Sequence, residues 1–99
     1  MGFFNNYKNI GLINQRIEVL QDLINSTYKS ICNEACSKEV LLKNIANIPI
    51  IATEIIDIAN NSDNSVKLAP FWYNGEKKPL LEIIQIVHDQ YMELLSIIK

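Results

Sequence analysis

The chain has 99 residues, of which 48% are hydrophobic and 20% are charged, and its formal net charge at pH 7 is −2. This length accommodates one small hydrophobic core, and the composition is that of a folding chain rather than a disordered one. The acidic pI near 5.3 and the single arginine, Arg16, argue against a nucleic-acid binder, because such proteins neutralise phosphates with many basic side chains.

The first predicted helix covers residues 3–32. A phenylalanine or an isoleucine recurs every seven residues through this segment, and two further apolar residues stand three positions after a member of that series. This a/d pattern is typical of helices that pack side by side, either within one bundle or between two chains. The residues of the pattern are Phe3, Ile10, Ile13, Ile17, Leu20, Ile24 and Ile31.

The length of this helix has a consequence for the shape of the molecule. A straight helix over residues 3–32 extends about 45 Å, whereas a compact chain of about 100 residues has a radius of gyration of about 13 Å. We therefore expect an elongated molecule, unless Gly11 breaks the helix or the helix projects to pair with another chain. Asn6 and Thr27 fall at d positions of the seam, where a polar residue sets the register at a cost in stability.

Two cysteines, Cys32 and Cys36, lie four residues apart where the first helix is expected to end. The spacing is not that of a Cys-x-x-Cys motif and the geometry is poor for a disulfide, so we expect a reduced, structural pair without a metal. Asn33 and Ser37 are both suitable N-caps, which predicts a bend between two helices here.

The second predicted helix covers residues 37–60. Its apolar series, four and three residues apart, keeps its phase across Pro49, so we expect one helix kinked at this proline rather than two helices. Further isoleucines occupy most of the remaining circumference, a pattern typical of a helix that is covered on more than one side. In so small a chain, this surplus predicts a homo-oligomer. The series is Leu41, Ile45, Ile48, Ala52, Ile55 and Ala59, and the further isoleucines are Ile50, Ile51, Ile56 and Ile58.

The last predicted helix covers residues 79–98, because Pro79 suits the first turn of a helix. Two adjacent apolar stripes follow: Leu80, Ile84, Val87, Tyr91, Leu94 and Ile98 form one, and Leu81, Ile84, His88, Met92 and Leu95 form the other. No strand pattern is evident. The predicted fold class is all-α, an elongated antiparallel bundle of three main helices in one domain over residues 1–99.

The stretch APFWYNGEKKP belongs to a segment, residues 66–78, that we expect to be an aromatic loop. In an extended chain Phe71 and Tyr73 point to one side and Trp72 to the other, so the three cannot all be buried in one bundle face. The Asn-Gly pair predicts a chain reversal, but the following Glu-Lys-Lys offers no apolar strand to complete a hairpin. The loop is either a plug at the end of the bundle, with Trp72 inside and the lysines solvated, or a contact surface. The candidate binding residues are Phe71, Trp72, Tyr73, Asn74, Lys77 and Lys78.

These residues predict a non-catalytic binding protein of the inhibitor, immunity or adaptor type, because tryptophan and tyrosine are favoured anchors in protein interfaces. The alternative is an oligomeric protein that sequesters a nucleotide-like phosphorylated signal, stacked on the aromatic rings with Lys77 and Lys78 near its phosphates. We expect no cofactor, no metal and no catalytic residue.

A less favoured alternative is a magnesium-dependent nucleotide hydrolase, since carboxylates from two helices are suitable Mg²⁺ ligands. The pairs Glu54/Asp57 and Glu18/Asp22 would supply them. The first pair is similar to the second of two acidic motifs in all-α nucleotide pyrophosphohydrolases of the MazG kind; the first motif is absent, and the chain is not assigned to that family. His88, the only histidine, has no nucleophile at a fitting spacing, so we expect a packed or interface residue.

The sequence contains no stretch long and apolar enough for a transmembrane helix and no evident signal peptide. The first residues include the glycine of a myristoylation signal, but Asn6 stands where serine or threonine is needed. We therefore expect a cytoplasmic protein without membrane association. Frequent Ile, Asn and Lys residues, which have A/T-rich codons, indicate a bacterial or phage genome.

Overall fold

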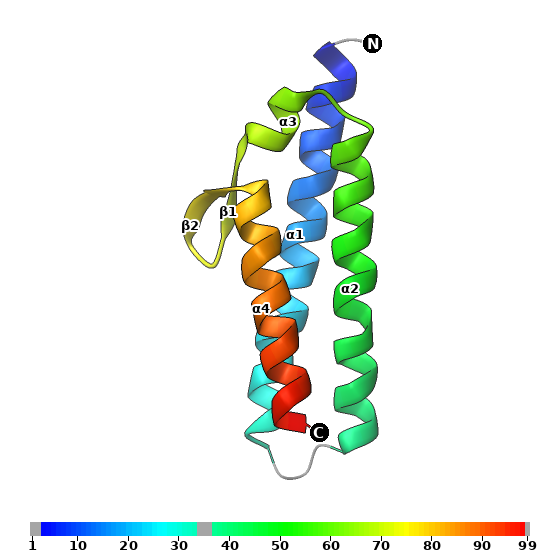
Figure 1. Cartoon of the computed structure of the whole chain (residues 1–99), viewed down its shortest axis with the longest axis vertical. Helices are drawn as coiled ribbons and strands as arrows, with labels where there is room; N and C mark the ends of the chain where they lie inside the picture. The colour runs from blue at the N-terminus through cyan, green and yellow to red at the C-terminus, as the bar shows by residue number, and fades with distance from the viewer. Residues whose placement is uncertain (1–2, 34–36, 99) are drawn as a thin grey trace.

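The computed structural model describes residues 3–33 and 37–98, with the side chains of the first helix from residue 7 onward. Three long helices lie side by side in a molecule that measures 50 × 22 × 17 Å (Figure 1). Helices α1 (Phe3–Ile31) and α4 (Leu80–Ile98) run in the same direction, and α2 (Lys38–Asn60) runs in the opposite direction against both. The all-α fold class and the elongated shape are confirmed.

Helix α1 is continuous through Gly11, so a single long helix accounts for the rod-like shape. Its apolar seam is buried within the chain, against α2 and the segment that precedes α4. The buried side chains of this seam are Ile13, Ile17, Leu20 and Ile24, with Ile10 and Ile31 partly buried. Thr27 is also buried and donates a hydrogen bond from its hydroxyl to the carbonyl oxygen of Leu23 at 2.7 Å. The side chains of Phe3 and Asn6, also predicted to belong to the seam, lie outside the described part.

Helix α2 follows the predicted N-cap, because Oγ of Ser37 accepts a hydrogen bond from the backbone N–H of Val40 at 3.3 Å. The helix continues through Pro49, so one helix rather than two is confirmed, while the kink at the proline remains a prediction. The side of α2 toward α1 and α4 is buried, but Ile50 on the other side is 56% exposed. The buried residues of α2 are Leu41, Ile45, Ile48, Ile55 and Ala59. Of the cysteine pair, Cys32 is exposed and Cys36 lies outside the described residues.

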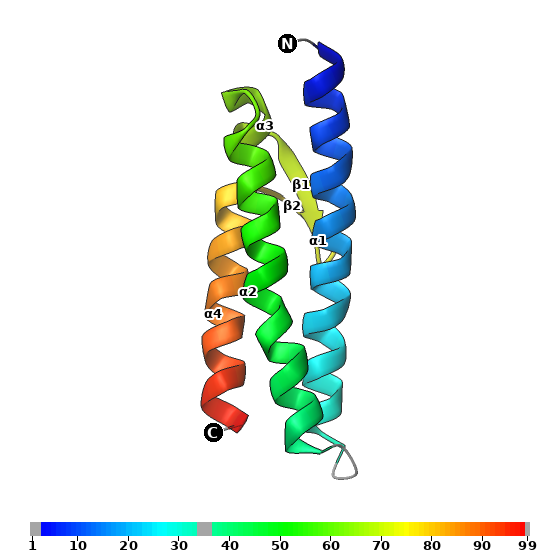
Figure 2. The same ribbon diagram turned by 90° about the vertical axis from the view of Figure 1, so that its right-hand side faces the viewer.

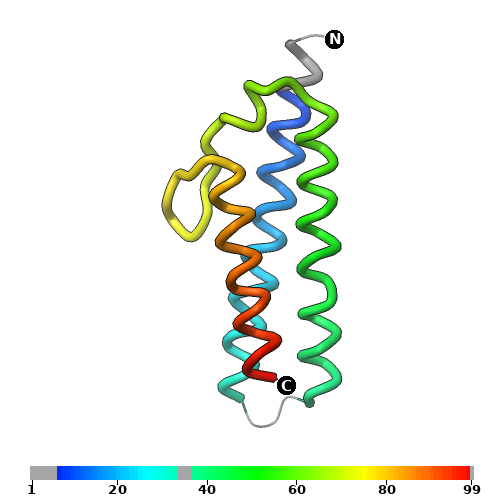
Figure 3. Tube along the Cα trace, viewed as in Figure 1, coloured from blue at the N-terminus to red at the C-terminus, as the bar shows by residue number. Residues whose placement is uncertain are grey.

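The segment that precedes α4 is not the irregular loop expected from the sequence. A short helix, α3 (Asn64–Leu68), leads into strand β1 (Pro70–Tyr73), which pairs antiparallel with β2 (Glu76–Pro79), and the resulting hairpin projects beside the first turns of α4 (Figure 3). The expectation that no strand forms was therefore wrong, and Pro79 ends β2 instead of starting the last helix.

The physical reason for this error lies in what holds the second strand. Asn74 and Gly75 have φ values of 51° and 85°, the positive angles that a type I′ hairpin turn requires at both central residues. β2 needs no apolar residues of its own, because it faces solvent and is held by its backbone bonds to β1. The burial that stabilises the hairpin comes from Phe71 and Tyr73 on β1 alone.

Helix α4 buries Leu80, Ile83, Val87 and Leu94, so the first predicted stripe faces the core in part, together with Ile83, which it did not include. The second predicted stripe is only partly covered, since Leu81, His88 and Met92 are exposed. Within residues 3–33 and 37–98, no helix combines the length and the apolar character needed to cross a membrane.

Candidate functional site

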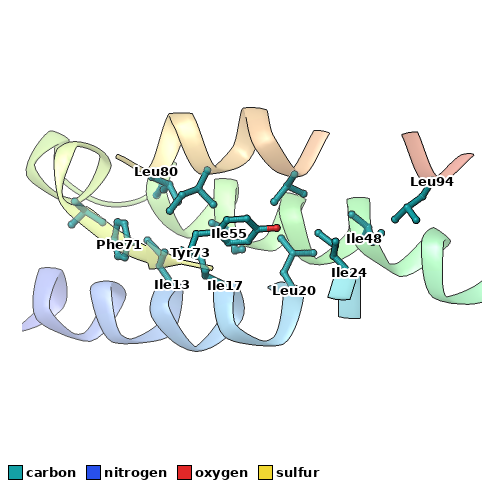
Figure 4. Close-up of a cluster of buried hydrophobic side chains, with 14 of the residues drawn as sticks. Ile13, Ile17, Leu20, Ile24, Ile48, Ile55, Phe71, Tyr73, Leu80 and Leu94 are labelled. Atoms are coloured by element: carbon teal, nitrogen blue, oxygen red, sulfur yellow. The ribbon is translucent and has the colours of Figure 1, made fainter. Parts of the chain in front are cut away.

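The aromatic hairpin is anchored in the core by two of its three aromatic side chains. Phe71 is 1% exposed and Tyr73 is 2% exposed, and Figure 4 shows both rings between α1 and α4, near Ile13, Ile17 and Ile55. The hydroxyl of Tyr73 donates a hydrogen bond to Oε1 of Gln90 on α4 at 2.6 Å. Burial raises the pKa of Tyr73 to about 12, with the nearby Tyr28 as a smaller cause, so this phenol stays neutral.

The turn of the hairpin is attached to α1 by polar contacts. The backbone N–H of Asn74 donates to Oε1 of Gln21 at 2.7 Å, and Nδ2 of Asn25 donates to Oδ1 of Asn74 at 3.3 Å. The hairpin is thus held at its base by the core and at its tip by α1. Such a platform presents the remaining aromatic side chain in a defined position.

Trp72 lies on the opposite side of β1 and is 58% exposed, as the strand alternation predicts. Its cross-strand neighbour is Lys77, whose Nζ lies 5.3 Å from the centroid of the indole ring, a cation–π distance. Trp72 and Gly75 border a surface hollow of about 340 Å³, and α1 supplies the rest of its wall. The wall residues from α1 are Asn14, Glu18 and Gln21.

We call this arrangement the Trp72 site; it consists of Trp72, Asn74 and Lys77 from the hairpin and of Asn14, Glu18 and Gln21 from α1. Three of the six predicted binding residues meet there. Phe71 and Tyr73 are buried instead, so the plug interpretation with Trp72 inside was wrong about which aromatic side chain the bundle buries.

Lys78, the sixth predicted residue, is engaged elsewhere. Its Nζ lies 3.0 Å from a carboxylate oxygen of Glu76 and 3.4 Å from one of Glu82. Hydrogen bonds to Glu76 and then to Glu82 raise the pKa of the Lys78 ammonium above its ordinary value. The positive charge nearest to the Trp72 ring is therefore that of Lys77, and Glu18 supplies a negative charge to the same hollow.

The α1 side of the site was missed in the sequence analysis, although a signal for it exists. Asn14, Glu18, Gln21 and Asn25 follow one another at intervals of four, three and four residues, which places them on one face of a helix, next to the apolar seam. A polar stripe at this spacing is commonly just a solvated face. Only the contacts of Asn74 in the turn with Gln21 and Asn25 show that this stripe lies against the hairpin.

The acidic residues considered for magnesium binding are placed differently. Oε2 of Glu54 lies 3.2 Å from Nε of Arg16, in a salt bridge between α2 and α1 whose two side chains are both about half exposed. Glu18 belongs to the Trp72 site. Within the part of the chain that the structure describes, no three His, Cys, Asp or Glu side chains are grouped closely enough to hold a metal ion. His88 lies at the surface, on the wall of an apolar groove between α2 and α4.

Comparisons of the chain with models of protein families, with curated proteins and with solved structures gave no match.

Proposed function

We propose that this chain is a non-catalytic binding protein that occupies a protein partner through the Trp72 site. The observation that carries the proposal is the contrast within β1, where Trp72 is 58% exposed between two neighbours that are at most 2% exposed. A tryptophan that is already held in place loses little conformational freedom when a partner covers it. Tryptophan is also among the residues that most often dominate the binding energy of protein interfaces.

The surroundings of Trp72 suit a protein partner that offers both apolar and polar side chains. The indole ring offers a large apolar surface, while the amides of Asn14 and Gln21 and the carboxylate of Glu18 border the hollow beside it. An aromatic centre with a polar rim is the usual composition of a protein interface. The partner would place an apolar side chain against the ring and a hydrogen-bond donor or a basic group near Glu18. Inhibitors, immunity proteins and adaptors work by such occupation.

The test compares capture of partners from a cell lysate by the immobilised wild type, by Trp72→Ala and by Leu68→Ala. Leu68 is the matched control, because it is a large apolar side chain that is 73% exposed on α3 and does not line the hollow. We expect Trp72→Ala alone to lose the partner. Equal capture by all three proteins would contradict the proposal.

A second measurement uses Trp72 itself, since it is the only tryptophan in the chain. Covering the ring should shift its fluorescence to shorter wavelength and protect it from an aqueous quencher. A captured partner that leaves the emission and the quenching unchanged would show that binding takes place at another surface.

A phosphorylated, nucleotide-like ligand is the second candidate, and it is favoured by one contact: the Lys77 ammonium lies beside an exposed ring on which a base can stack. The pairing of Lys78 with two glutamates and the carboxylate of Glu18 in the hollow count against it. A thermal-shift panel of nucleotides, including cyclic dinucleotides, tests this candidate. A ligand at a hundredfold excess over its Kd stabilises by about 2.7 kcal/mol.

The expected pattern for the ligand candidate is loss of the shift in Lys77→Glu and retention in Lys78→Met. No shift with any nucleotide would exclude the candidate. The magnesium-dependent hydrolase is tested separately, by incubating the same nucleotides with the protein and Mg²⁺ or Mn²⁺. Release of product that depends on both Glu54 and Asp57 would be required for it.

A further inference from the structure

The outer side of α2 is uncovered along its whole length. In Figure 2, α2 faces the viewer and no other described element lies in front of it. On the flank of this side toward α4, the exposed side chains that follow one another are neutral: Leu42, Ala46, Pro49, Thr53, Ile56 and Asn60. They extend over about 27 Å at 1.5 Å per residue.

This side of α2 continues into an apolar groove toward α4. Two adjoining hollows of about 190 Å³ and 150 Å³ share Ile56 of α2 and Ile84 of α4 in their walls. The exposed Leu81 of α4 lines the smaller hollow, and Lys67 of α3 borders it as well. Contiguous apolar surface of this kind on a small protein marks an interaction surface.

The charges on the outermost side of α2 identify what covers it. Lys43 stands seven residues before Ile50, and Asp57 stands seven residues after it, so all three lie along one line of α2, opposite its buried side. Both charged side chains are exposed, and neither has a salt-bridge partner in the described part of the chain. Ile50, at the midpoint between them, is 56% exposed.

Opposite charges placed symmetrically about an apolar residue fit a second copy of the same helix. When two identical helices pair antiparallel about a two-fold axis at Ile50, each residue before position 50 faces the residue equally far after it. Lys43 then meets Asp57 of the partner subunit, the reciprocal pair forms at the other end, and Ile50 meets its own copy. A parallel pairing would instead oppose lysine to lysine and aspartate to aspartate, and these like charges disfavour it.

We propose that the protein forms an antiparallel homodimer through the outer side of α2, with its two-fold axis at Ile50. The Trp72 site is not part of this interface, so the proposal is independent of the proposed function. Of the surplus isoleucines on α2, Ile51 and Ile58 pack against the core of the same chain, and the exposed Ile50 lies on the proposed axis.

The first experiment measures the dimer dissociation constant by sedimentation equilibrium, where the wild type should have twice the mass of the 11.3 kDa chain. Lys43→Asp and Asp57→Lys should each weaken the dimer by about tenfold or more, because each places like charges together at both ends of the interface. The double variant Lys43→Asp/Asp57→Lys should restore the wild-type affinity. Lys8→Asp, an exposed charge reversal on α1, is the matched control and should change nothing.

The second experiment tests the register directly with cysteines placed in a Cys32→Ser/Cys36→Ser background. Ile50→Cys should form a disulfide-linked dimer under mild oxidation, because position 50 faces its own copy. Lys43→Cys alone should not cross-link to itself, since the two copies of position 43 lie about 21 Å apart along the pair. A mixture of Lys43→Cys and Asp57→Cys chains should cross-link.

The proposal is overturned by a wild type that stays monomeric at millimolar concentration, or by a double charge reversal that does not restore the dimer. A dimer that Trp72→Ala dissociates while Ile50→Glu leaves it intact would place the interface on the hairpin and would overturn the proposal as well. Far-ultraviolet circular dichroism of each variant verifies that the helices remain folded.

Discussion

The hydroxyl of Tyr73 donates a hydrogen bond to Oε1 of Gln90 at 2.6 Å. This bond joins strand β1 to the middle of α4. The ring of Tyr73 also lies against α1, so one side chain connects the hairpin with both helices that flank it. The position of the exposed Trp72 therefore depends on a contact in the interior. Substitution of Tyr73 should therefore change both the stability of the protein and the geometry of the Trp72 site.

Alkaline pH should destabilise the protein through this tyrosine. Its pKa in the folded chain is about 12, above the ordinary value of 10.0, so the unfolded chain loses the phenol proton first. The stabilisation is complete below pH 10 and is lost as the pH rises through 12. Urea unfolding between pH 8 and pH 11.5 should show a steep fall in the free energy of unfolding. A fall of the same steepness in Tyr73→Phe would contradict this assignment.

The Tyr73→Phe variant should also cost about 1 kcal/mol at pH 8, because Gln90 loses its donor. Some alkaline sensitivity should persist in it. Burial, together with the hydrogen bond from its hydroxyl to Glu93, raises the pKa of Tyr28 in the same direction. Adding Tyr28→Phe to this variant should remove part of the remaining loss of stability at alkaline pH.

Replacement of Gly11 and of Gly75 by alanine should change the stability of the protein in opposite directions. A Cβ would meet no atom within 4 Å at either Gly11 or Gly75, so crowding does not distinguish them. Gly11→Ala should stabilise the protein by about 0.5–1 kcal/mol, because alanine favours the helix interior. Gly75→Ala should destabilise it by about 1–2 kcal/mol, because φ is +85° there. Thermal unfolding of both variants measures the difference, and equal signs would contradict the type I′ turn.

Neighbouring aromatic residues of β1 should differ greatly in their contribution to stability. Phe71→Ala should cost about 3–5 kcal/mol, because it leaves a cavity where a ring is buried between helices. Trp72→Ala should cost about 1 kcal/mol or less, since the ring is largely exposed. Calorimetry should separate them clearly, as 1 kcal/mol corresponds to about 4–8 °C in a protein of this size. Similar costs for the two would mean that Trp72 is not presented to solvent.

Thr27 should be replaceable by valine with a gain in stability. Its hydroxyl donates only to the carbonyl of Leu23, which lies within α1 where the helix supplies a backbone donor. Thr27→Val therefore leaves no polar atom unpaired and should raise the free energy of unfolding by up to about 1 kcal/mol. Thr27→Ser, which keeps the hydroxyl and loses the methyl group, should lower it by about 1 kcal/mol. Chemical unfolding of the two variants gives the comparison.

Much of the helical architecture could be predicted from the sequence, since helix formation and helix faces depend on residues within a few positions of one another. The seam from Ile13 to Ile24 is buried as its spacing indicated, and Ser37 caps α2. The alternation of an extended chain likewise predicted that Trp72 points away from Phe71 and Tyr73, but it left open which of these rings is buried.

The hairpin and the floor of its site depended on tertiary structure. β2 has no apolar pattern, and its pairing is stable only because Phe71 and Tyr73 find a space between α1 and α4. The turn docks on Gln21, which is 53 residues away in the sequence. The partners of Lys78, Glu76 and Glu82, are near it in the sequence, and the sequence analysis missed them because it did not place strand β2. The sequence by itself determined the three long helices and the buried seam of α1, because these follow local periodicity. Which side chains meet at the surface was decided by the packing of segments far apart in the chain, which no local pattern encodes.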